Sequence, residues 1–78
     1  MKTQSEKDLR FAVCVNNTDY PALLERHKIY CVLPDEDAEK DGDLRIIDES
    51  GEDYLYPADY FVLVRLPQIV ETSLLKAA

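Results

Sequence analysis

A chain of 78 residues, 46% of them hydrophobic, has the size of one small domain and is too apolar for intrinsic disorder. Nine basic residues against sixteen acidic ones give a formal net charge of −7. Nucleic acid and anionic membrane surfaces attract clustered Lys and Arg, so this charge disfavours both as partners. A polar start without the apolar stretch of a signal peptide, and the lack of any run near the ~20 apolar residues of a membrane span, favour a cytoplasmic protein.

The first third of the chain predicts a tail, a strand and an ambiguous loop. Residues 1–9 are polar and are expected to form a mobile tail. Period-two alternation over residues 10–15 predicts a strand that is buried on both faces. Residues 16–19 are turn formers that end it. Residues 21–27 allow either a short helix that begins at its Pro, which would make the fold α+β, or an irregular hairpin loop.

The middle of the chain predicts three further strands. Residues 28–33 form the second strand, and a Pro stops it. Residues 35–43 contain six acidic side chains, so we expect a solvated loop with at most a helical turn. Residues 44–48 and 53–56 form the third and fourth strands. The turn between them contains Gly51, which tolerates a positive φ.

The last third predicts a 3₁₀ turn over residues 57–60, a fifth strand over 61–66 that pairs with the first, and an amphipathic helix over 67–78. The helix carries an apolar stripe that caps the rest of the domain or docks a partner. We therefore predict an all-β fold, a five-stranded Src-homology-3-like (SH3-like) barrel over residues 10–66, with a short C-terminal helix. Its expected core is Phe11, Val13, Val15, Ile29, Cys31, Leu44, Ile46, Leu55, Phe61 and Val64, and the stripe of the helix is Ile69, Val70 and Leu74.

The two cysteines, Cys14 and Cys31, predict no redox or zinc motif because they are not in a C-x-x-C pair. We expect both to be reduced, buried and structural. His27 is the only histidine, and the sequence places no nucleophile beside a base. We therefore expect neither catalytic activity nor a cofactor.

The segment over residues 56–64 resembles the end of a Src-homology-3 domain, in which an aromatic or aliphatic residue, a Pro, two small or polar residues and a Tyr precede the final strand. This resemblance implies that Pro57 and Tyr60 lie on a groove for proline-rich peptides. That family's groove has a Trp wall, and this chain contains no Trp. The alternative is that Pro57 sets the turn and Tyr60 plugs the end of the barrel.

A second segment, Ile-Ile-Asp-Glu-Ser-Gly-Glu-Asp-Tyr-Leu-Tyr-Pro over residues 46–57, resembles a group of short, uncharacterised bacterial and phage proteins with an SH3-like barrel. The similarity extends over residues 10–66. It implies the barrel fold and no particular activity.

The acidic loop partly matches a calcium-binding loop. Asp37, Glu39 and Asp41 supply oxygens at loop positions one, three and five, Gly42 falls at position six, and Asp48 at position twelve. The alternative is an exposed acidic hairpin loop without metal.

Tyrosines are the best candidates for a binding surface, because Tyr combines a large ring with a polar tip. The five are Tyr20, Tyr30, Tyr54, Tyr56 and Tyr60. We predict a non-catalytic protein- or peptide-binding module, as a monomer or weak dimer, whose surface is formed by Tyr54, Tyr56, Pro57 and Tyr60. The alternative function is a divalent-cation-responsive domain that uses residues 35–43.

Overall fold

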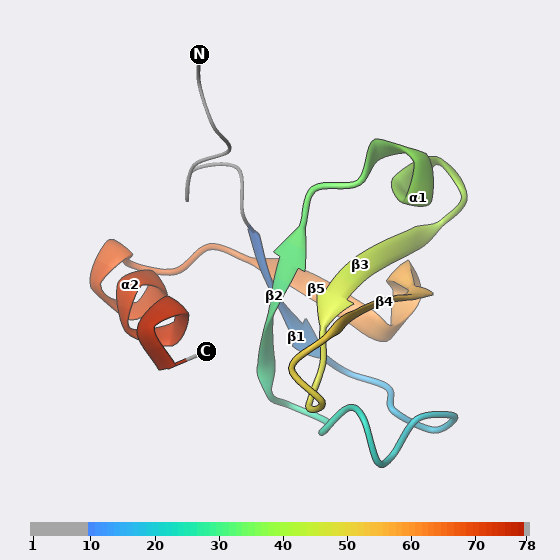
Figure 1. Cartoon of the computed structure of the whole chain (residues 1–78), viewed down its shortest axis with the longest axis horizontal. Helices are drawn as coiled ribbons and strands as arrows, with labels where there is room; N and C mark the ends of the chain where they lie inside the picture. The colour runs from blue at the N-terminus through green and yellow to red at the C-terminus, as the bar shows by residue number, and fades with distance from the viewer. Residues whose placement is uncertain (1–9, 78) are drawn as a thin grey trace.

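The computed structural model describes residues 10–77, and the tail expected at residues 1–9 lies outside the described residues. The elements are β1 (Arg10–Cys14), β2 (Ile29–Leu33), α1 (Glu36–Lys40), β3 (Asp43–Ile47), β4 (Asp53–Pro57), the 3₁₀ turn η2 (Ala58–Tyr60), β5 (Phe61–Val64) and α2 (Gln68–Ala77). The strands form one antiparallel sheet in the order β4-β3-β2-β1-β5 (Figure 1). The predicted pairing of the fifth strand with the first is confirmed.

The sheet curls around its core. β4 and β5 are the two edges of the strand order, and no strand ladder joins them. Nevertheless Tyr56 in β4 and Phe61 in β5 belong to the same buried cluster, with ring centroids 6.3 Å apart. Tyr30 in β2 meets the same Phe61 ring at 6.4 Å. All five strands therefore contribute side chains to one core on the concave face of the sheet.

The segment between β1 and β2 is an irregular loop, and the alternative of a helix over residues 21–27 is wrong. Its base is closed by two backbone hydrogen bonds, from Cys14 N–H to the Lys28 carbonyl (2.9 Å) and from His27 N–H to the Cys14 carbonyl (2.6 Å). The Tyr20 carbonyl accepts from the N–H groups of Leu23 and Leu24, which makes one turn only. That turn directs Leu24 into the core, where it is 1% exposed.

The acidic stretch contains more structure than a solvated loop. Asp35 caps α1, because its carboxylate accepts a hydrogen bond from the Ala38 N–H at 3.0 Å. Gly42 ends the helix with a φ of +83°, a conformation that other residues rarely adopt. Its carbonyl accepts from the Ala58 N–H at 2.8 Å, so the end of α1 is fastened to η2. The positive φ predicted at Gly51 is also confirmed.

Four of the predicted core residues are buried, namely Phe11, Leu44, Ile46 and Phe61. Others are not: Val15 is 41% and Leu55 45% exposed, and Val13, Ile29, Cys31 and Val64 are half-buried. In β1, β2 and β4 the face predicted as the core is not the face that forms the buried cluster. The inner face carries Tyr30 and Val32 in β2 and Tyr56 in β4, together with Ala12, Cys14 and Leu24 from the first part of the chain.

Tyrosine can occupy that inner face because its hydroxyl finds an acceptor. The Tyr30 hydroxyl donates to Glu49 at 2.5 Å, and the Tyr56 hydroxyl donates to Asp48 at 2.6 Å. A buried hydroxyl without a partner is costly, so these two carboxylates allow the tyrosine-bearing face of each strand to be buried. The sequence pattern alone favoured the purely aliphatic face.

Helix α2 lies to one side of the sheet (Figure 1). Leu74 and Leu75 are half-buried and line a hollow together with Phe11, Ile29 and Cys31. The predicted stripe is therefore only partly correct: Ile69 is 79% exposed and Val70 37%. Among the described residues, no helix has the length and apolar character needed to cross a membrane.

The half-buried Leu74 beside this hollow and the exposed Ile69 predict unequal effects of two alanine substitutions. Leu74→Ala should lower the free energy of unfolding by about 1 kcal/mol, or about 4–8 °C in melting temperature, because it removes half-buried apolar area. It should also speed alkylation of the Cys31 thiol, which lines the same hollow. Ile69→Ala is the control and should change neither quantity. Equal effects of the two substitutions on thermal melting would contradict this placement of α2.

Candidate binding site

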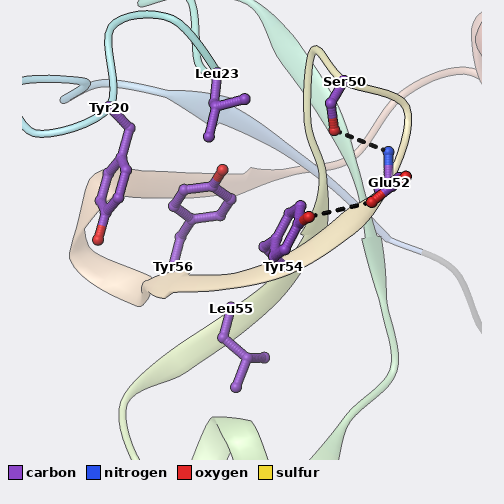
Figure 2. Close-up of a pocket in the computed structure, with 7 residues that line it drawn as sticks. All are labelled: Tyr20, Leu23, Ser50, Glu52, Tyr54, Leu55 and Tyr56. Atoms are coloured by element: carbon purple, nitrogen blue, oxygen red, sulfur yellow. Dashed lines mark hydrogen bonds between the residues drawn. The ribbon is translucent and has the colours of Figure 1, made fainter.

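A hollow of about 310 Å³ lies between the loop over residues 15–28 and the β3–β4 hairpin (Figure 2). The loop contributes Tyr20 and Leu23. The hairpin contributes the remaining lining residues, which are Ser50, Glu52, Tyr54, Leu55 and Tyr56. Most of the lining is therefore aromatic or aliphatic, with a single carboxylate at one end.

Strand geometry arranges the rings of the hollow. Tyr54 and Tyr56 are two residues apart in β4 and so share one side of the strand, whereas Leu55 extends from the other side (Figure 2). Tyr56 is buried, and Tyr54 is 50% exposed. Tyr20 crosses from the loop and meets Tyr56 edge-on, with ring centroids 5.0 Å apart. The hollow thus has a buried ring as its floor and two accessible rings at its sides.

The buried Asp48 carboxylate fixes the hairpin beneath the hollow. It accepts hydrogen bonds from the Tyr56 hydroxyl (2.6 Å), the Ser50 hydroxyl (2.5 Å) and the Ser50 N–H (2.9 Å). Burial by itself raises the pKa of the Asp48 carboxyl. The hydrogen bonds from Ser50 and Tyr56 outweigh that effect and hold its pKa below the ordinary value.

The neighbouring Glu49 ties the hairpin to the loop. Its carboxylate accepts from the Lys28 ammonium (2.6 Å) and the Tyr30 hydroxyl (2.5 Å), and its N–H donates to the Leu23 carbonyl (2.9 Å). The hydrogen bonds from Lys28 and Tyr30 lower the pKa of the Glu49 carboxyl. Because Leu23 lines the hollow, this contact fixes the spacing between its two walls.

The accessible tyrosines are held by exposed acids. The Tyr54 hydroxyl donates to Glu52 at 3.1 Å, which raises the pKa of Tyr54. The Tyr60 hydroxyl donates to Asp19, which raises the pKa of Tyr60 to about 12. Both side chains therefore remain neutral at physiological pH, with intact aromatic rings available for contact.

The predicted binding residues are only partly gathered by the structure. Tyr54 and Tyr56 line the hollow, and Tyr60 adjoins it through Tyr20, at 6.2 Å between ring centroids. Pro57 is half-buried at the entrance to η2 and is not among the lining residues. The prediction missed Tyr20, Leu23 and Glu52 as members of the site. Tyr20 belonged to the wider tyrosine set, but only the fold of the loop over residues 15–28 places it against β4.

The structure places the proposed metal ligands in different settings. Asp37 and Glu39 lie on α1, and Asp41 ends that helix. Asp48 lies in the β3–β4 hairpin, where its carboxylate already accepts hydrogen bonds from Ser50 and Tyr56. Glu39 forms an ion pair with Arg10. Across residues 10–77, no three His, Cys, Asp or Glu side chains gather into a group that could hold a metal ion.

Both cysteines are free thiols, with Cys14 buried as predicted and Cys31 only partly so. Burial raises the pKa of each thiol, which keeps the reactive thiolate form scarce.

No protein-family model, curated protein or solved structure matches this chain.

The buried Tyr56 hydroxyl and the exposed Tyr54 hydroxyl give a matched pair of substitutions. Tyr56→Phe should lower the free energy of unfolding by about 1–3 kcal/mol, because it leaves the Asp48 carboxylate buried without one of its donors. Tyr54→Phe should leave stability unchanged, since water replaces its hydrogen bond. Urea denaturation measures the free energy of unfolding of both variants. A Tyr56→Phe variant as stable as the unmodified protein would rule out the proposed role of this hydrogen bond.

Proposed function

We propose that the protein is a non-catalytic module that binds a protein or peptide through the hollow and the adjoining Tyr60. The observation that supports this most is the half-exposed ring of Tyr54 beside a rigidly held buried ring, Tyr56. Tyrosines that are ordered before binding lose little conformational entropy on association, which is why such residues are enriched at interaction hot spots. The hollow accommodates one or two side chains of a partner.

We further infer that the curled sheet is an SH3-like barrel, of the kind found in the group of short bacterial and phage proteins that residues 46–57 resemble. Three features support this inference: the pairing of β5 with β1, the 3₁₀ turn η2 directly before β5, and a long irregular loop between β1 and β2. In this arrangement the loop and the β3–β4 hairpin meet at one side of the barrel and form the binding surface.

A random peptide display library tests the proposal against a matched pair of variants. Tyr54 is 50% exposed in β4, and Val62 is 53% exposed in β5 at the other edge of the sheet. We expect peptides selected on the unmodified protein to bind Tyr54→Ala at least about tenfold more weakly, a loss of ~1.4 kcal/mol. Val62→Ala should retain their affinity. Selected peptides that tolerate Tyr54→Ala, or a library that yields no specific binder, would refute a binding function for this surface.

A further inference from the structure

We propose that the hollow receives a cationic side chain of the partner, specifically an arginine guanidinium, against the ring of Tyr54 with the Glu52 carboxylate as its counter-charge. This inference rests on the proposed function and specifies the chemistry of the partner segment. Three observations support it: the charge of the hollow, its exposed aromatic surface, and the flat shape and paired N–H groups of a guanidinium.

The charge of the hollow is negative and uncompensated. Glu52 is the only charged residue in the lining, and no Lys or Arg lies among the seven lining residues. The adjoining Asp53 is already paired with Arg45. Among the ion pairs within residues 10–77, none includes Glu52, whose hydrogen-bond partner is the Tyr54 hydroxyl.

The exposed rings suit a cation better than a neutral or anionic group. Tyr54 is 50% exposed and its hydroxyl donates to Glu52, so its ring offers accessible π surface beside that carboxylate (Figure 2). Tyr20, which is 38% exposed, lies at the other end of the hollow. The electron-rich face of an aromatic ring attracts a positive charge, and the attraction grows as water is displaced. A purely apolar side chain would cover the Glu52 carboxylate without neutralising it, and an anion would be repelled.

Guanidinium matches this combination better than ammonium does. Its flat, weakly hydrated group stacks on tyrosine rings while its N–H groups form paired hydrogen bonds with a carboxylate. The formal net charge of −7 also raises the rate at which a basic segment meets the protein.

A pair of small probes isolates the charge. N-acetyl-arginine amide and N-acetyl-citrulline amide have nearly the same shape, but only the first is cationic. In NMR titrations we expect the arginine probe to give saturable shifts at the Tyr54 ring and the Glu52 side chain, with a dissociation constant in the millimolar range. The citrulline probe should give none. Equal shifts from the two probes, or arginine shifts spread over the surface without saturation, would overturn the proposal.

Two charge-removing variants complete the experiment. Glu52→Gln should weaken arginine-probe binding up to about fivefold, in keeping with an exposed ion pair of up to ~1 kcal/mol. Glu36→Gln removes an equally exposed acid on α1 and should leave the affinity unchanged. Equal effects of the two variants would refute the role of Glu52. Display peptides that lose binding to Tyr54→Ala but carry no Arg and tolerate Glu52→Gln would reject the cationic partner while leaving the proposed function intact.

Discussion

The hydrogen bond between the Tyr56 hydroxyl and the Asp48 carboxylate, at 2.6 Å and buried, is the interaction on which the rest of the structure depends. It joins β4 to the turn that precedes it and allows a tyrosine to face the core. The Tyr56 ring then packs against Phe61 in β5 and meets Tyr20 from the loop. One side chain therefore contributes to the curl of the sheet, the hairpin and the floor of the hollow.

A second acid from the same turn repeats this arrangement. The Glu49 carboxylate accepts a hydrogen bond from the Tyr30 hydroxyl in β2 and pairs with Lys28, and the Glu49 N–H donates to the Leu23 carbonyl. Two consecutive carboxylates thus satisfy both buried hydroxyls and fasten the loop to the hairpin. Because these contacts fix the walls of the hollow, Tyr54 and Tyr20 stay exposed in defined positions. This pre-organisation supports the binding role that we propose for the hollow.

Local patterns predicted the elements well and their inward faces poorly. Alternation located the strands, Gly51 marked the hairpin turn, and the segment around Pro57 indicated η2. The burial of Tyr30 escaped prediction because it depends on Glu49, 19 residues away in the chain. Helix α1 was predicted only as a helical turn within a solvated loop, because a run of acids dominates the segment. Asp35, three residues before Ala38, is an ordinary helix cap that indicates the helix.

The candidate binding site, like the buried faces of the strands, was predicted only in part from the sequence. Tyr54 and Tyr56 share one face of a strand by their spacing alone, so sequence reasoning found them. Tyr20 and Leu23 join them only because Leu24 is buried and Glu49 binds the Leu23 carbonyl. Those are long-range contacts, and no spacing within the loop encodes them.

The measurement that tests this account most directly is an NMR pH titration of the Asp48 side-chain carboxyl in the folded protein. The hydrogen bonds that the ionised carboxylate accepts should hold its pKa below the value of about 3.9 for an unfolded Asp. A carboxyl whose pKa is lowered by folding stabilises the fold fully above the unfolded pKa, and that contribution is lost as the pH falls through the folded pKa. The account predicts a folded pKa below about 3.9, whereas a value at or above it would show that burial prevails and that the network does not hold Asp48 ionised.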